Sequence, residues 1–260
     1  MNPTWEADTL VAVRSKNVDR YKRNYLRQAV CELRFPTLME LGAARPPEKF
    51  VTALRKDYPY LELQNEVTLA LGSVSSGSNS THVFRSAKLN WTVSLKESAV
   101  SIETTAYTEY AQMREKVLRV VDAATKVIDS DFFTRVGLRY INVIEGTDDP
   151  RNGWVNHQLV APIVGTNFKG IGEYAGKLQL VAGDGGCLLQ HGIRVSRQQK
   201  DASIHPEYML DVDVFRNEVA VDDVSAALDV MHSQAFDVFD WSLGEKAREY
   251  LSSAGKSTKG

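Results

Sequence analysis

The stretch Asp131–Ile144, near the midpoint of the 260 residues, constrains the fold more than any other part of the sequence. Its side chains alternate in character, which is the pattern of a β-strand with one buried face. One parity carries Phe132, Val136, Leu138, Tyr140 and Ile144, and the other carries Arg135, Gly137 and Arg139. We therefore predict a central strand with one apolar face and one face that bears arginines.

A shorter copy of this pattern lies near the start of the chain. Cys31–Phe35 matches Val136–Tyr140 position by position, so Arg34 corresponds to Arg139. Each copy is followed by the same predicted order of helix, three strands and long helix. In the first half the predicted strands are 27–35, 61–71, 83–95 and 99–107, with helices at 46–59 and 109–128; in the second half they are 131–144, 173–181, 187–196 and 208–219, with helices at 154–164 and 224–239.

This order predicts an α+β fold, a tandem duplication of a strand-helix-three-strand-helix unit. Strands with one polar parity favour an antiparallel sheet covered on one face by two long helices, in the manner of TATA-binding-protein-like or helix-grip-like folds. The predicted boundaries are an arm at 1–26, repeats at 27–130 and 131–252, and a disordered tail at 253–260. The Ser/Gly/Asn-rich stretch 72–81 is expected to be a loop that does not pack.

Composition restricts the class of protein. A hydrophobic content of 43% and a charged content of 25% are ordinary for a globular chain, and a net charge of −2 provides no general attraction for nucleic acid or an anionic membrane. The start of the chain lacks the pattern of a signal peptide, and no apolar run reaches the ~20 residues of a membrane-spanning helix. The two cysteines have no metal-ligand spacing, so we expect a reduced, cytoplasmic protein without a membrane partner.

Motifs that suggest chemistry have structural explanations here. Gly183–Gly186 leads into an alternating run, so a hairpin turn is favoured over a phosphate loop. Asp211 and Asp213 share one side of a strand and are expected to face water; without a third ligand they predict no metal site. Cys187 and His191 lie about 13 Å apart along a strand, too far for a nucleophile–base pair. We expect His191 to be a hydrogen-bonded core histidine, and we predict no catalytic residues and no cofactor.

The arginines of the two matching strands leave two interpretations open. Arg34, Arg135 and Arg139 can bind an anionic partner or ligand from the helix-free face. Alternatively, they form salt bridges to neighbouring carboxylates, for which the candidates are Glu32, Glu103, Asp211 and Asp213. Gly137, between two of the arginines, predicts a bulge or a close approach of another group to the backbone.

Three short motifs together carry a family resemblance. They are Gln28–Phe35, Arg135–Asn142 and the late residues His232, Phe236-Asp237 and Trp241–Leu243. With these the chain resembles a sporadically distributed family of uncharacterised prokaryotic proteins, about 260 residues long and without an assigned activity. Patchy occurrence of this kind implies mobile, defence-associated or toxin–antitoxin-like genes, phage defence among them.

The leading functional hypothesis is a non-enzymatic binding or scaffolding protein that recognises a protein partner, or a second copy of itself, through its sheet face or a sheet edge. A first alternative is a ligand-binding or hydrolytic pocket for a small molecule between the sheet and a long helix, with His191, Tyr140 and Arg139. A second alternative is a nucleic-acid-binding module that uses the basic stretch 14–27 with the sheet arginines.

Overall fold

The computed structural model describes residues 10–70, 73–145, 149–166, 168, 170–197 and 204–253. It confirms the α+β class and the large antiparallel sheet. Within the described residues the hydrogen-bonded strand order is β2-β3-β4-β5-β1-β6-β9-β8-β7. The strands are β1 (Leu26–Arg34), β2 (Tyr60–Ala70), β3 (Ser73–Arg85), β4 (Trp91–Leu95), β5 (Ala99–Thr104), β6 (Phe132–Ile144), β7 (Glu173–Ala182), β8 (Gly185–Arg197) and β9 (Ile204–Ala220).

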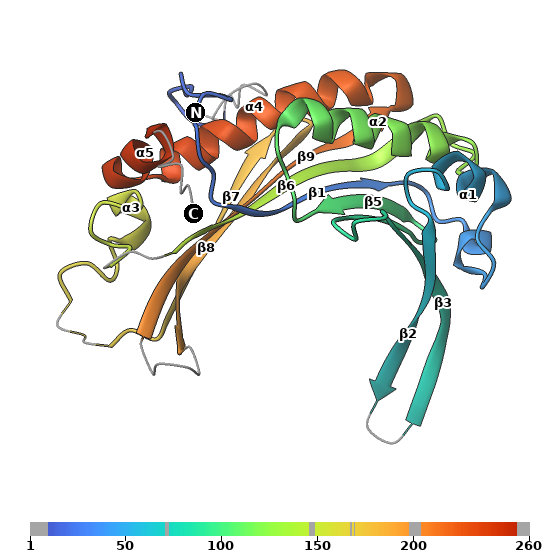
Figure 1. Cartoon of the computed structure of the whole chain (residues 1–260), viewed down its shortest axis with the longest axis horizontal. Coiled ribbons are helices and arrows are strands. Elements are labelled where there is room, and N and C mark those ends of the chain that lie inside the picture. Colours follow the sequence, from blue (N-terminus) through green and yellow to red (C-terminus); the bar gives the residue numbers. More distant parts are fainter. Residues whose placement is uncertain are drawn as a thin grey trace, which may run out of the picture. The chain divides into compact units, whose positions relative to one another are not determined.

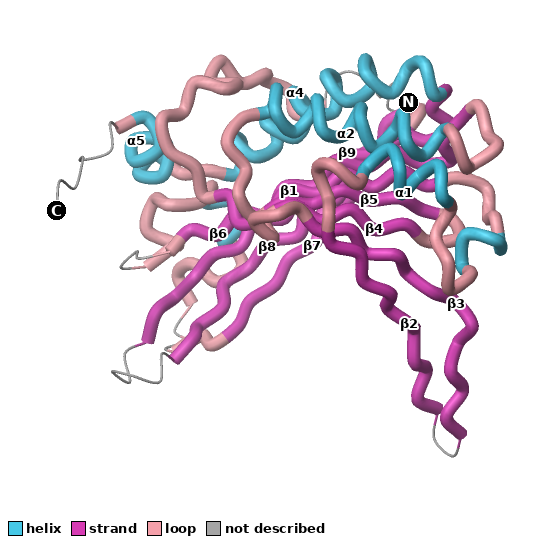
Figure 2. Tube along the Cα trace, turned by 45° about the vertical axis from the view of Figure 1, so that its right-hand side comes forward, coloured by secondary structure: helices cyan, strands magenta, loops and turns pink. Residues whose placement is uncertain are grey.

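The described residues contain five helices, and the helix at Tyr110–Thr125 lies on one side of the strands that precede it in the chain (Figures 1 and 2). The helices are α1 (Glu48–Leu54), α2 (Tyr110–Thr125), α3 (His157–Val160), α4 (Val224–Ser242) and α5 (Glu245–Ser252), with short 3-10 turns at Met39–Gly42 and Val221–Asp223. No helix in the described ranges is long and apolar enough to cross a membrane.

The chain divides into two compact units, each built from distant segments. The β1 unit comprises Gln28–Leu138 and Phe215–Asp229, and the β7 unit comprises Met1–Arg27, Arg139–Val214 and Val230–Gly260. Strands β6 and β9 therefore contribute residues to both units. Of the predicted terminal segments, 1–9 and 254–260 lie outside the described residues.

In the β1 unit, the predicted alternation of β1 decides which side chains enter the core. Cys31 and Leu33 are fully buried, while Glu32 and Arg34 face the other side. Helix α2 covers the buried face with an apolar stripe, and it lies over β1 and β5 in Figure 1. Its buried members include Met113, Val117, Val120, Val121 and Ala124.

In the β7 unit, β7 and β8 form a regular hairpin. All ten residues of β7 pair with β8, from Glu173 opposite Arg194 to Ala182 opposite Gly185. The connection is the two-residue turn Gly183-Asp184, so the glycine-rich stretch is the hairpin turn that the sequence predicts.

Three local predictions were wrong. Residues 73–81, expected to be a loop, belong to β3, which pairs with β2 on both sides of a register shift between Asn65 and Val67. The single predicted strand 83–95 is two strands, since the chain turns at Ser86–Asn90 with Leu89 in the left-handed region (φ +57°). In β6, Phe133 is buried and Phe132 is not, because the alternation shifts by one residue before Val136.

Candidate functional site

Two of the three candidate binding arginines, Arg34 and Arg135, contact the same carboxylate in the β1 unit. Arg34 Nε donates to Glu32 Oε1 over 2.7 Å, and Arg135 Nη1 lies 3.5 Å from the same oxygen. The Arg135 guanidinium also lies 4.9 Å from the centre of the Phe215 ring, where a cation–π contact is favourable. Gly137 leaves the space in which this guanidinium lies across the backbone, which is the close approach that the glycine predicts.

Arg139 lies in the β7 unit and has a different partner. Its Nε donates to Asp211 Oδ1 over 2.7 Å, and its Nη2 donates to Oδ2 over 2.5 Å. The Asp211 side chain is only 4% exposed, whereas Arg139 is 42% exposed. The prediction that Asp211 faces water was therefore wrong, because the guanidinium covers the carboxylate and satisfies both of its oxygens.

Tyr140 points to the opposite side of β6 and joins a hydrogen-bonded chain. Its hydroxyl lies 3.0 Å from Nδ1 of the buried His232 on α4, and Nε2 of His232 lies 3.2 Å from the Asp19 carboxylate. If Nε2 donates its proton to the carboxylate, Nδ1 is free to accept from the tyrosine hydroxyl. This chain connects β6, α4 and the segment before β1.

The segment before β1 is docked onto α4 and α5 over part of its length. The backbone N–H of Ser15 donates to Asp237, the Ser15 hydroxyl donates to Asp240 over 2.8 Å, and Tyr21 stacks on Phe236. Burial raises the pKa of Asp237, and the N–H of Ser15 opposes that rise. The late motif of the family resemblance therefore contains residues that hold this segment in place.

His191 is a hydrogen-bonded core histidine. Its Nδ1 lies 2.8 Å from the hydroxyl of the buried Tyr208, whose ring stacks on the imidazole. The Tyr174 ring packs against the imidazole with ring centres 6.1 Å apart, and the imidazole lies over Gly176 of the neighbouring strand. Burial lowers the pKa of His191, so the ring is held neutral.

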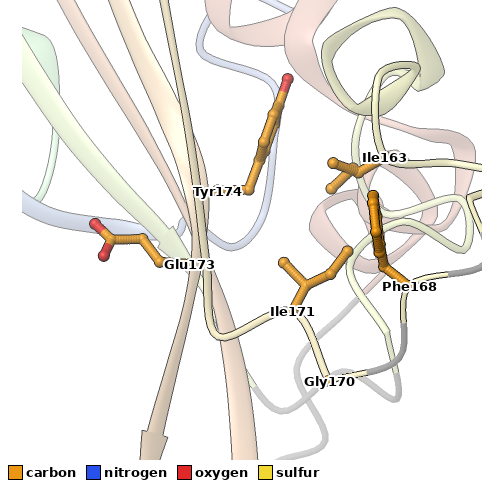
Figure 3. A pocket seen from close by; sticks show the side chains of 6 residues that line it. All are labelled: Ile163, Phe168, Gly170, Ile171, Glu173 and Tyr174. Carbon is orange, nitrogen blue, oxygen red and sulfur yellow. The ribbon is translucent and has the colours of Figure 1, made fainter.

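An open pocket of about 390 Å³ lies beside the start of β7. Ile163, Phe168 and Ile171 present apolar side chains to it, while Glu173 points to the other side of the strand (Figure 3). The Tyr174 hydroxyl is already used, since it donates to the Leu159 carbonyl over 3.0 Å. This pocket therefore has an apolar wall and no arranged set of reactive groups.

The three residues of the predicted pocket have different hydrogen-bond partners. Arg139, Tyr140 and His191 belong to three separate clusters, and none of them lines the pocket beside β7. Burial, followed by the charges of Asp213 and Asp211, raises the pKa of Cys187 to about 12, so its thiol stays protonated and unreactive. Among the described residues, no three His, Cys, Asp or Glu side chains are grouped to hold a metal ion.

The outer edge of β7 is a feature that the sequence did not single out. β7 is the last strand in the hydrogen-bonded order of the described residues. Its pairing with β8 runs without a register shift, and it contains no proline. Leu178 and Val181 are 40% and 50% exposed on it. A long, regular edge strand with exposed apolar side chains is a template for another strand.

The sequence was also compared with protein-family models and with curated proteins, and neither comparison gave a match.

Proposed function

We propose that this chain is a non-enzymatic recognition or scaffolding protein that binds a protein partner by strand addition at the outer edge of β7. The observation that carries the proposal is the open edge itself: ten residues in continuous register, without bulge or proline, at the end of the sheet. Proteins usually protect such edges with bulges, prolines or charged side chains, and of these β7 carries only the charges of Glu173 and Lys177, so the edge favours a binding role.

Strand addition needs main-chain groups for affinity and side chains for specificity. On β7 the main-chain groups of alternate residues are directed outward, because those of the intervening residues bond to β8. Leu178 and Val181 lie on opposite faces of the strand and add exposed apolar surface on both sides of the edge. The other end of the sheet, β2, is less suitable because its register shifts between Asn65 and Val67, and such irregularities discourage edge pairing.

The proposal is tested with a matched pair of variants at Gln179. Gln179→Pro removes an outward N–H and leaves the bonds to β8 intact, whereas Gln179→Ala keeps the N–H and removes only the side chain. A partner is captured from the native host with the unaltered protein, identified, purified and measured against both variants by calorimetry. We expect Gln179→Ala to bind and Gln179→Pro to lose binding. Equal affinity of the partner for both variants, or capture of neither a host protein nor a second copy of the chain, would contradict the proposal.

The tandem duplication is a separate proposal about how the fold arose. It is supported by the matching segments: Cys31 and Leu33 on β1 and Phe35 directly after it are buried, as are Val136, Leu138 and Tyr140 on β6. The two halves also differ in two ways. Four strands lie between α1 and α2 but only three between α3 and α4, and Arg34 and Arg139 pair with different carboxylates. We attribute the additional strand to a later division of the predicted 83–95 strand.

The biological setting stays a prediction. Both cysteines are buried as thiols and are not joined in a disulfide, which supports a reducing compartment such as the cytoplasm. The family resemblance adds the prediction that the partner belongs to a mobile or defence-associated system.

A further inference from the structure

The backbone of β7 limits the ways in which another strand can join it. The N–H of Val195 donates to the carbonyl of Gly172 over 3.0 Å, and the hairpin closes at Ala182 opposite Gly185. In an antiparallel pair, hydrogen-bonded residues alternate with non-bonded ones. The even-numbered residues of β7 therefore bond to β8, and the odd-numbered residues from 173 to 181 direct their N–H and C=O groups to the outer edge.

Side-chain charge then selects among the permitted registers for two antiparallel copies of β7. Only registers that place odd residues opposite odd residues match the outward groups. The register with the most overlap places Lys177 opposite the partner's Lys177, and like charges directly opposite are destabilising. Two registers come next, and neither places like charges opposite each other. The first, centred on Gly176, places Lys177 opposite the partner's Ala175; the second, centred on Leu178, places Lys177 opposite the partner's Gln179 and Ala175 opposite the partner's Val181.

This second register also covers the exposed apolar side chains. Leu178 lies opposite the partner's Leu178, and Val181 meets the partner's Ala175. Both leucines are 40% exposed in the single chain, so their contact removes apolar surface from water. The four pairs of outward residues supply about eight new backbone hydrogen bonds.

We propose that the occupant of the β7 edge is a second copy of this chain, joined in antiparallel orientation about a twofold axis at Leu178. The proposal rests on the proposed strand-addition function and names the partner for the same edge. Such an interface is self-complementary, as twofold dimers require. The result is a continuous sheet that crosses from one copy to the other.

Cysteine crosslinking tests the register directly. Opposite residues of a non-bonded antiparallel pair have Cα atoms about 4.5 Å apart, within the range of a disulfide. We expect Leu178→Cys to form a covalent dimer under mild oxidation. Gln179→Cys alone is the matched control, because it keeps the Lys177 charge and its counterpart lies on the diagonal at about 7–8 Å, too far for a disulfide. The native cysteines, both fully buried, do not compete for crosslinking.

Further measurements distinguish self-pairing of β7 from the strand-addition function on which it rests. An equal mixture of Lys177→Cys and Gln179→Cys proteins should crosslink to each other, and Gln179→Pro added to Leu178→Cys should abolish its crosslink. Native mass should be twice 29.0 kDa for the unaltered chain and 29.0 kDa for Gln179→Pro. A monomeric mass, or Leu178→Cys crosslinking no more than Gln179→Cys, overturns the self-pairing. Loss of a captured host protein by Gln179→Pro would then still support recognition at this edge.

Discussion

Replacing Arg139 by methionine is expected to destabilise the fold because it leaves the Asp211 carboxylate buried without its cation. The carboxylate is 4% exposed and takes both hydrogen bonds from this guanidinium at 2.7 and 2.5 Å. Removing one member of a fully buried ion pair costs about 3–5 kcal/mol. Arg139 is 42% exposed, so water already screens part of the interaction, and we expect a loss of about 2 kcal/mol.

The measurement is urea unfolding of the purified variants. With a slope of about 2 kcal/mol per molar urea, the expected loss moves the midpoint by about 1 M. Arg34→Met is the matched control, because that guanidinium is 55% exposed and its partner Glu32 is also in contact with solvent. Exposed ion pairs contribute about 0–1 kcal/mol, so the control should stay close to the unaltered protein.

A double-mutant cycle isolates the pair itself. Asp211→Asn removes the buried charge, so Arg139→Met should cost less in that background by about 1–2 kcal/mol. The reasoning would be refuted if Arg139→Met and Arg34→Met had the same effect on the free energy of unfolding, or if the cycle showed no coupling between Arg139 and Asp211.

The remaining predictions concern buried groups. Burial raises the pKa of the Cys187 thiol to about 12, so this thiol should not react with a thiol reagent in the folded protein. Both cysteines should react in denaturant. Rapid labelling of the folded protein would contradict the conclusion that the thiol is buried and protonated. Burial lowers the pKa of His82, so the unfolded chain binds more protons than the folded one. The free energy of unfolding should therefore fall as the pH drops below about 6.5. A His82→Gln variant should lose less stability over this pH range, and an equal loss would remove His82 as the cause. Gly176→Ala should cost about 1–3 kcal/mol because its Cβ would meet the imidazole of His191, whereas Gly172→Ala, with open space around it, should be nearly neutral by the same urea assay.

The sequence alone determined the elements whose pattern is local. The alternation of β1 and of β6 from Val136 onward, the apolar stripe of α2 and the Gly183-Asp184 turn were all predictable, because strand and helix periods are properties of neighbouring residues. The burial of His191 followed from the same alternation, since it shares a parity with apolar neighbours on β8.

Only the tertiary structure decided which side chains meet. The sequence named Asp211 as one of four candidate partners for the arginines, but only the tertiary structure shows that Arg139 covers it. The serine-rich 73–81 stretch is a strand because β2 pairs with it. The open edge of β7 is likewise a property of its place in the sheet. Strand order and cross-strand partners depend on residues far apart in the chain, and a local pattern contains no information about them.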